Sequence, residues 1–383
     1  MKILWLASWY PDRYEPVNGD FVQRHARAVS SLIPIDIIHV VQVGKDVKTK
    51  NDCLYTVNGN LREWVYSFSF TKWGIGPLDK LRYHIKFWYF YRGILLKYAL
   101  IYGKPNLVHV QVTMKAGIAA LKISTQWGIP YIVSEHSSLY DPAAIDNFLT
   151  RSFFFRYYTK KVFKNATCIT CVSEAIGKRI QQLAGNKKIE IIRNVVDTHL
   201  FNFQPSLTVK FKWLHVSSMQ PVKNVAAILK AFEQLYLIRQ DWELEIVGPF
   251  TEMHSQWVRE AGLAHHISFK GEVSHAQVAI HMKKASALVL FSIYENLPCV
   301  ILEALCCGLP IVSSEVGGTN EAVNRSNGIL VESNNLEQLI KALQNMMTNY
   351  DQYNRVLIAK EAASKYAIPV IAQQFVQLYQ RLL

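Results

Sequence analysis

The sequence lacks any run of about 20 apolar residues, the length that a helix needs to cross a bilayer. Its most apolar segment, 87–100, is interrupted by Arg92 and Lys97. No small-residue cleavage site follows the short apolar run at the N-terminus, which does not fit a secretory signal peptide. We therefore expect a cytoplasmic protein whose membrane contact is peripheral.

Cysteine is scarce, with six residues in 383, and in a cytoplasmic chain this argues against a disulfide framework. Cys168 and Cys171 have C-x-x-C spacing, but they lie in the β-rich run TCITCVS, and no second pair completes a four-ligand site. Asp-x-Asp is absent, and no His, Asp and Glu cluster has metal-ligand spacing. We predict buried thiols, no metal and no cofactor.

Charge is unevenly distributed along a chain whose length and half-apolar composition suggest two globular domains. Residues 1–200 contain 27 Lys and Arg against 14 Asp and Glu, whereas residues 201–383 contain 15 of each. The whole net charge of +13 therefore lies in the first half. Such an asymmetry predicts that one domain faces an anionic surface, which is phospholipid, nucleic acid or a phosphorylated acceptor.

Apolar runs bounded by turns alternate with helix-period segments, the pattern of parallel sheets with crossover helices. The expected strands are 2–8, 35–43, 107–112, 131–136, 167–173 and 189–194, then 213–218, 244–248, 267–271, 287–292, 310–314 and 328–332. The sequence FNFQPSLTVK breaks this alternation at 201–210. We predict an α/β protein with doubly wound domains at 1–203 and 204–383, and a site where their strand-end loops converge.

The segment 291–323, FSIYENLPCVILEALCCGLPIVSSEVGGTNEAV, carries the most chemistry. Glu295 follows a strand, and Pro298 suits the first turn of a helix because its missing N–H has no intrahelical partner there. The free amides of 296–300 would then form an anion site suited to a diphosphate.

Glu303 would lie about one turn into the same helix. An ionised carboxylate there can accept hydrogen bonds from two vicinal ribose hydroxyls. In the alternative interpretation, Glu295 caps the helix and Glu303 is solvated. The apolar neighbours of Glu303 favour the functional interpretation, because carboxylates are rarely buried without a partner.

The Glu-x7-Glu spacing, followed by GLPIVSSEVGGTNEAV and NGILV, resembles the GT-B glycosyltransferases of family 4. Further matching positions are Gly19, HVQ at 109–111, EHS at 135–137, RNVVD at 193–197 and PVKN at 221–224. The resemblance implies two Rossmann-like domains facing across a cleft. Residues 1–203 would bind the acceptor and face a membrane, residues 204–383 would bind the donor, and the last helix would pack back on the first domain.

The resemblance also implies roles for individual residues. Glu303 corresponds to the glutamate that binds the nucleotide ribose, and Glu295 to the one that contacts the sugar hydroxyls. Lys223 corresponds to the lysine that neutralises the pyrophosphate, and His136 to the histidine beside the donor sugar. The predicted catalytic residues are His136, Lys223 and Glu295, and the predicted donor-binding residues are Gly19, Ser218, Lys223, Glu295, Asn296, Leu297, Pro298 and Glu303.

Ser218 departs from the family pattern, in which an arginine often precedes the lysine by five residues. Some compensation of the phosphate charge must then come from elsewhere. Lys223 also has a local rationale, since it follows an expected strand and opens a helix. Asn194 and Asp197 are assigned a structural role at the domain junction.

Without a metal, the leaving diphosphate would be stabilised by Lys223 and by helix amides. The family's retaining outcome implies attack on the front face of the sugar through an oxocarbenium-like transition state. The departing phosphate would help to deprotonate the acceptor.

Two segments, 72–104 and 151–164, interleave basic with aromatic residues. This composition suits the headgroup layer of an anionic membrane, although a buried crossover helix with solvated lysine tips is the alternative. No nucleic-acid recognition motif is present, so we expect no nucleic-acid partner. The first half is therefore expected on the inner face of the cytoplasmic membrane.

Together these features predict a retaining glycosyltransferase that moves a sugar from a UDP- or GDP-sugar to a glycan or lipid-linked acceptor, such as a cell-surface polysaccharide or lipopolysaccharide precursor. One alternative is an enzyme similar to UDP-N-acetylglucosamine 2-epimerase, which shares the two-domain layout and needs no acceptor. The other is a non-catalytic membrane scaffold, which Ser218 favours.

Overall fold

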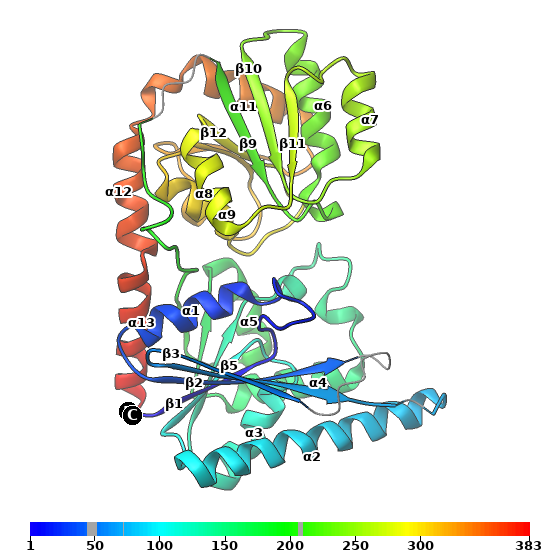
Figure 1. Cartoon of the computed structure of the whole chain (residues 1–383), viewed down its shortest axis with the longest axis vertical. Coiled ribbons are helices and arrows are strands. Elements are labelled where there is room, and N and C mark those ends of the chain that lie inside the picture. The colour runs from blue at the N-terminus through cyan, green and yellow to red at the C-terminus, as the bar shows by residue number, and fades with distance from the viewer. Residues whose placement is uncertain (44–51, 72, 206–209) are drawn as a thin grey trace.

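A computed structural model describes residues 1–43, 52–71, 73–205 and 210–383 of the chain. It contains two α/β domains, each built on its own sheet (Figure 1). The first sheet has the order β3-β4-β2-β1-β5-β6-β7-β8, and all neighbours are parallel except the antiparallel pair β3 and β4. Its strands are β1 (Ile3–Ala7), β2 (Ile35–Val43), β3 (Cys53–Asn58), β4 (Leu61–Ser69), β5 (Leu107–Gln111), β6 (Tyr131–Glu135), β7 (Cys168–Cys171) and β8 (Ile189–Ile191).

The second sheet is parallel throughout, with the order β11-β10-β9-β12-β13-β14. Its strands are β9 (Phe211–Val216), β10 (Trp242–Val247), β11 (Ile267–Gly271), β12 (Ala287–Leu290), β13 (Ile311–Ser314) and β14 (Gly328–Val331). This is the doubly wound order 3-2-1-4-5-6, whose direction of winding reverses between β9 and β12. In the first sheet the equivalent reversal lies between β1 and β5. Each domain therefore has one switch point, where ligands bind in such sheets.

Helices connect the strands. In the first domain they are α1 (Asp20–Ser30), α2 (Gly76–Tyr102), α3 (Ala116–Trp127), η1 (Ser138–Tyr140), η2 (Phe148–Thr150), α4 (Phe153–Asn165) and α5 (Glu174–Ala184). From the second domain onward they are η3 (Pro221–Lys223), α6 (Val225–Tyr236), α7 (Glu252–Glu260), α8 (His275–Lys284), α9 (Cys299–Cys306), α10 (Thr319–Ala322), α11 (Leu336–Thr348), η4 (Tyr350–Gln352), α12 (Arg355–Tyr366) and α13 (Ile368–Leu382). None of the helices in the described ranges is long and apolar enough to span a membrane.

The twelve strands expected from apolar runs all form, because strands covered on both faces are continuously apolar. Strands β3 and β4, which form a hairpin at the edge of the first sheet, were not predicted. Every residue of β3 is exposed, so the strand has no apolar run to reveal it. A usable signal was the dipeptide Gly59-Asn60, the two-residue loop of this hairpin, where Gly59 adopts a φ of 57°.

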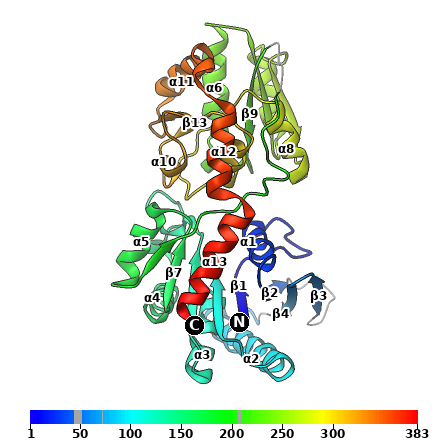
Figure 2. The same ribbon diagram turned by 90° about the vertical axis from the view of Figure 1, so that its left-hand side faces the viewer.

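The chain returns to the first domain at its end. Helices α12 and α13 run along both domains, and α13 packs against α1 (Figure 2). Trp5 Nε1 donates to the hydroxyl of Tyr379 at 3.1 Å, and the same hydroxyl lies 2.7 Å from His109 Nδ1. The predicted division after residue 203 falls in the connection between β8 and β9, of which residues 206–209 lie outside the described ranges.

Candidate active site

The switch point of the second sheet brings Lys223 and Glu295 together. Lys223 follows β9 and Glu295 follows β12, so both side chains lie beyond the carboxyl ends of the two strands that flank the reversal. Lys223 Nζ donates to Glu295 Oε1 at 2.5 Å, and Ser292 Oγ donates to the same oxygen at 2.8 Å. The expected helix start at Lys223 was wrong, because this residue ends the 3-10 turn η3 and α6 begins at Val225.

Helix α9 begins one residue later than expected. Pro298 is its N-cap rather than its first helical residue, and the helix starts at Cys299. The first amides of a helix have no intrahelical acceptor, so an anion can still bind here. The loop after β13 closes over this start, where Gly318 N donates to Asn296 O at 2.6 Å. A Cβ atom on Gly317 would lie 1.7 Å from Glu295 O, so this approach requires glycine.

Glu303 is buried and shared between the two domains. Its Oε1 accepts a 2.6 Å hydrogen bond from Arg24 Nη1 of α1 and lies 2.8 Å from His275 Nε2 of α8. Burial alone would raise the pKa of Glu303, but the hydrogen bond from His275 and the charge of Arg24 hold that pKa below its usual value. Glu303 is therefore an ionised acceptor with positively charged and polar partners already in place.

Two asparagine side chains connect the domains at the start of α9. Asn296 Nδ2 donates to His136 O at 2.6 Å, and Asn194 Nδ2 donates to Leu297 O at 2.8 Å. The start of α9 is thus attached to the first domain by two hydrogen bonds. The Asn194 contact agrees with the structural role that the sequence suggested for this residue.

The ring of His136 packs between Phe21 and His25, with centroid distances of 4.8 and 5.5 Å. Both ring nitrogens are buried and have no hydrogen-bond partner. Burial, and secondarily the charge of a protonated His25, lower the pKa of His136 well below its usual value. The imidazole is therefore neutral at pH 7, with one nitrogen able to accept and one able to donate a hydrogen bond.

Gly19 belongs to the first domain and Ser218 to the second. Gly19 is the N-cap of α1 with a φ of 70°, and a Cβ there would lie 2.5 Å from the carbonyl carbon of Trp9. The tight turn thus requires glycine. Ser218 is exposed in the loop between β9 and η3.

Sequence reasoning missed Arg24 and His275, the two partners of Glu303. Arg24 lies 279 residues from Glu303 along the chain, so no local spacing links them. His275 is the first residue of α8 and directly follows Ser274, which forms a capping box with Gln277. Cys168 and Cys171 are buried free thiols on β7. Within the described ranges, His, Cys, Asp and Glu side chains form no metal-binding group of three or more.

Comparison with known families matches two adjoining stretches of the chain. The profile described as "Glycosyl transferases group 1" matches residues 199–364, and that described as "Glycosyltransferase Family 4" matches residues 55–200. An uncharacterised glycosyltransferase of Methanocaldococcus jannaschii is 27% identical over 247 residues, which are 64% of this chain and 66% of that protein. A putative teichuronic acid biosynthesis glycosyltransferase of Bacillus subtilis is 23% identical over 386 residues, covering 90% and 88% of the two chains.

Solved structures share the fold over the whole chain. Sucrose-phosphate synthase from Thermosynechococcus elongatus has a TM-score of 0.80 at 18% identity, covering 100% of this chain and 99% of its own. Anabaena HepE in complex with UDP has a TM-score of 0.74 at 17% identity, covering both chains completely. These likenesses confirm the predicted fold class, two Rossmann-like domains of the GT-B type. The chain spans about half to two thirds of the length of several curated relatives that it matches.

Proposed function

Since the chain belongs to the family 4 glycosyltransferases and is a transferase of sugars, we propose that it moves a sugar from a nucleotide-sugar donor to an acceptor at a membrane, with retention of configuration. The observation that supports the donor most is the assembly of Lys223, Glu295 and Glu303 at the switch point of the second sheet. HepE, which has the same fold, binds UDP, and UDP is the nucleotide that a UDP-sugar donor would release in the proposed reaction.

In this proposal each group meets one part of the donor. Glu303 accepts the ribose hydroxyls, as an ionised carboxylate suits two donors. The diphosphate binds to the first amides of α9 and to Lys223, which leaves Glu295 Oε1 when the phosphate arrives. Glu295 then accepts hydroxyls of the sugar, and the neutral His136 lies on the first-domain side of that sugar.

The proposed reaction breaks the bond between the anomeric carbon and the phosphate oxygen. Negative charge grows on the departing diphosphate, where the ammonium of Lys223 stabilises it more strongly than in the ground state. The acceptor hydroxyl attacks the face that the phosphate leaves, which retains the configuration. Its proton passes to an oxygen of the departing phosphate, so that the atoms and charges balance.

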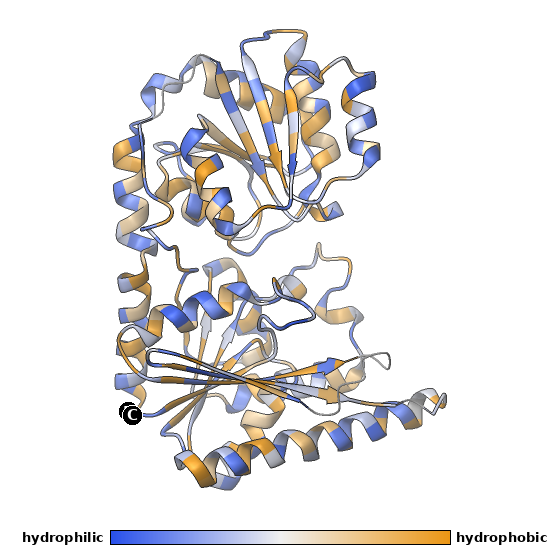
Figure 3. Ribbon diagram, in the orientation of Figure 1, coloured by the Kyte–Doolittle hydropathy of each residue, from blue (hydrophilic) through white to orange (hydrophobic). Residues whose placement is uncertain are grey.

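Helix α2 supports the membrane part of the proposal. Its inner face buries aromatic and aliphatic side chains, whereas exposed apolar residues recur on its outer face at helical spacing. These are Leu78, Leu81, Ile85, Tyr89, Leu96 and Leu100. Tyr89 is 66% and Leu100 86% exposed. A row of exposed apolar side chains of this kind marks a surface that contacts a membrane or a partner. Figure 3 shows apolar and polar residues mixed along the whole of α2 at the outer edge of the first domain.

Basic residues accompany this apolar face. Lys80, Lys86 and Arg92 are exposed on α2, and Phe153 is exposed at the start of α4. Cations beside apolar side chains suit an anionic headgroup layer, and each contributes about 1 kcal/mol near such a surface. At a membrane the proposed acceptor is lipid-linked, and we take it to be a precursor of a surface polysaccharide. The likeness to the putative teichuronic acid glycosyltransferase also favours such an acceptor.

Thermal unfolding with a panel of UDP- and GDP-sugars tests the proposed donor, because a ligand at 100 times its Kd stabilises by about 2.7 kcal/mol. The stabilising sugar nucleotide should then give free nucleotide and a glycosylated lipid-linked acceptor. Formation of an epimeric sugar nucleotide without acceptor would instead identify an epimerase. Binding with neither reaction would indicate a scaffold.

A further inference from the structure

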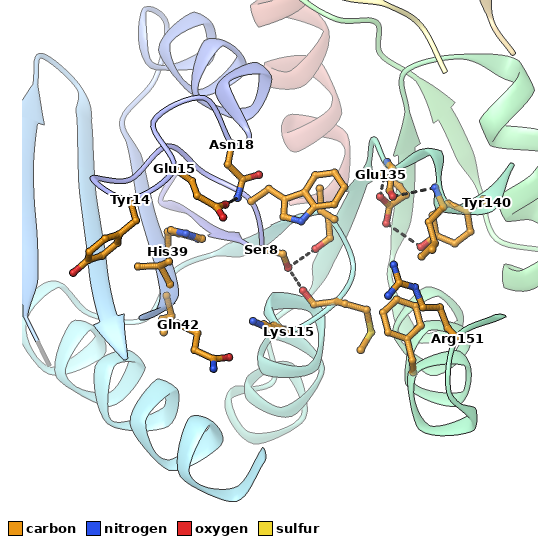
Figure 4. Close-up of a pocket in the computed structure, with 18 residues that line it drawn as sticks. Ser8, Tyr14, Glu15, Asn18, His39, Gln42, Lys115, Glu135, Tyr140 and Arg151 are labelled. Atoms are coloured by element: carbon orange, nitrogen blue, oxygen red, sulfur yellow. Dashed lines mark hydrogen bonds between the residues drawn. The ribbon is translucent and has the colours of Figure 1, made fainter. Parts of the chain in front are cut away.

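A cavity of about 400 Å³ lies in the first domain, apart from Lys223, Glu295 and Glu303 (Figure 4). It is located beyond the carboxyl ends of β1, β2, β5 and β6, at the switch point of the first sheet. Its volume lies within the range of small-ligand pockets. Two cations, Lys115 and Arg151, lie on its wall.

Lys115 is held there by an unusual backbone. Val112 and Lys115 have φ angles of 63° and 67°, a region that non-glycine residues rarely adopt. Ser8 fixes this loop, since its hydroxyl bonds to the carbonyls of Val112 and Met114 and accepts a hydrogen bond from Ala116 N. A residue keeps such a strained backbone conformation only where its surroundings hold it in place, and residues of this kind cluster at ligand-binding sites.

A second, smaller cavity of about 100 Å³ lies between α2, α3 and α4 and shares Met114 and Lys115 with the first. Its walls are largely aromatic, including Tyr83, Phe87, Trp88 and Tyr91. Lys115 Nζ lies 5.9 and 5.6 Å from the ring centroids of Tyr83 and Phe87. Lys115 therefore lies at the boundary between the larger, polar cavity and the smaller, aromatic cavity.

Two wall residues of the small cavity carry unsatisfied polar groups. The hydroxyls of Tyr83 and Tyr91 are buried and have no hydrogen-bond partner, and Tyr91 is 1% exposed. Burial raises the pKa of Tyr83 to about 12 and also raises that of Tyr91, so both remain protonated. A buried hydroxyl without a partner costs free energy. A hydrocarbon brings no acceptor, so only an oxygen of a group bound at Lys115, whose Nζ lies 5.9 Å from the Tyr83 ring centroid, would recover it.

Lys115 is available to an anion, while two carboxylates also line the larger cavity. Among the ion pairs of the described residues, Lys115 and Lys122 take part in none, and Arg151 pairs with Asp146. The carboxylate of Glu135 on the same wall is already satisfied by the amides of Thr113, His136 and Ser137. Glu15 is the other carboxylate lining the cavity, and it accepts from Asn18 at 2.8 Å.

We propose that Lys115 binds the phosphate of a polyprenyl-phosphate-linked acceptor, with the first isoprene unit in the aromatic cavity and the first sugar in the larger cavity. This inference rests on the proposed function, because it assumes the lipid-linked acceptor. An apolar cavity of 150 Å³ accepts benzene, so about 100 Å³ accommodates roughly one five-carbon unit and excludes a pair of acyl chains. The rest of the lipid would leave past the exposed Phe153 and Tyr157 of α4.

Calorimetry with three probes tests the two parts of the site separately. Inorganic phosphate tests Lys115, farnesol tests the aromatic cavity, and farnesyl phosphate tests both. Wild type should bind farnesyl phosphate at least tenfold more tightly than either of the other two. Excess UDP or GDP should not displace it, because the donor site lies in the second domain. Displacement by nucleotide, or equal affinity for all three probes, would overturn the inference.

Variants locate the site. Lys115→Gln should lower the affinity for farnesyl phosphate at least tenfold, whereas Lys164→Gln, which removes an exposed lysine of α4, should leave it unchanged. Ile118→Phe, which fills the aromatic cavity, should reduce the affinity towards that of inorganic phosphate. Thermal unfolding checks that each variant is folded, and unchanged affinity in both site variants would contradict the inference.

Transfer assays separate this inference from the proposed function. If wild type and Lys115→Gln glycosylate a polyprenyl-linked acceptor with the same KM, Lys115 does not bind the phosphate, while the proposed function stands. If wild type binds the donor but not farnesyl phosphate, the lipid-linked acceptor and this inference are both wrong, while the transfer of sugars remains.

Discussion

Replacing Glu303 with glutamine changes the proposed ribose site and an interdomain contact at once. Glu303 Oε1 holds Arg24 of the first domain at 2.6 Å and lies 2.8 Å from His275. Glutamine has nearly the same shape but only one acceptor oxygen and no charge. We expect the variant to lose affinity for the free nucleotide.

The size of this loss follows from the hydrogen bonds involved. A hydrogen bond to a charged group contributes about 1.5–3 kcal/mol, and 1.4 kcal/mol corresponds to a factor of ten in affinity. In the proposed site two ribose hydroxyls would bind to this one carboxylate, so the loss of charge should weaken nucleotide binding at least tenfold. Arg24 keeps a second partner in Asp20, which limits the structural damage.

Calorimetry with the nucleotide that stabilises the wild type measures the effect. Glu321→Gln is the matched control, because Glu321 also joins the domains, accepting from Ala175 N at 3.2 Å and from Arg193 at 3.4 Å. The control should change nucleotide affinity less than twofold. If Glu303→Gln binds as well as the wild type, Glu303 does not contact the ribose. If both variants lose the same affinity, domain contact rather than ribose recognition explains the loss.

Two further predictions concern the phosphate and the membrane. Lys223→Ala should lower kcat more than donor affinity, because the charge that Lys223 meets grows as the bond breaks, and wild-type activity should persist in EDTA; restoration by Mg²⁺ after chelation would contradict the metal-free mechanism. Reversing three exposed α2 cations to Glu should strongly weaken co-sedimentation with phosphatidylglycerol vesicles while donor affinity is kept, whereas the same change at three exposed lysines of the second domain should not; equal sedimentation would leave α2 an ordinary crossover helix. The α2 residues are Lys80, Lys86 and Arg92, and the control residues are Lys230, Lys284 and Lys360.

Arg82 is left unchanged in the membrane experiment for a structural reason. Its guanidinium lies 3.1 Å from the ring centroid of Trp73 and 3.0 Å from the carboxylate of Asp79. A glutamate there would disturb the start of α2 as well as the surface charge. Lys72 of the same basic segment lies outside the described residues.

Twelve of the strands could be predicted because burial on both faces of a sheet produces continuous apolar runs in the sequence. The hairpin of β3 and β4 could not be recognised in this way, since β3 is exposed throughout. Likewise, Lys223 and Glu295 were identifiable because each lies in the loop beyond a strand and matches the family pattern. Their 2.5 Å contact depends on the strand order, which brings β9 and β12 together.

Residues that act through distant partners were not predictable. Arg24 reaches Glu303 only because the two domains close on each other. Lys115 faces two cavities because of the positive φ angles of its loop, which no propensity of valine or lysine would suggest. The strands and the residues beyond their ends can thus be predicted from the sequence, whereas contacts between the domains can be identified only in the folded structure.

A crystal structure of the protein with the nucleotide that stabilises it tests the central claim most directly. The account predicts the ribose hydroxyls within hydrogen-bond distance of Glu303 and the diphosphate at Lys223 and the start of α9. A nucleotide bound instead in the first-domain cavity beside Lys115 would contradict it.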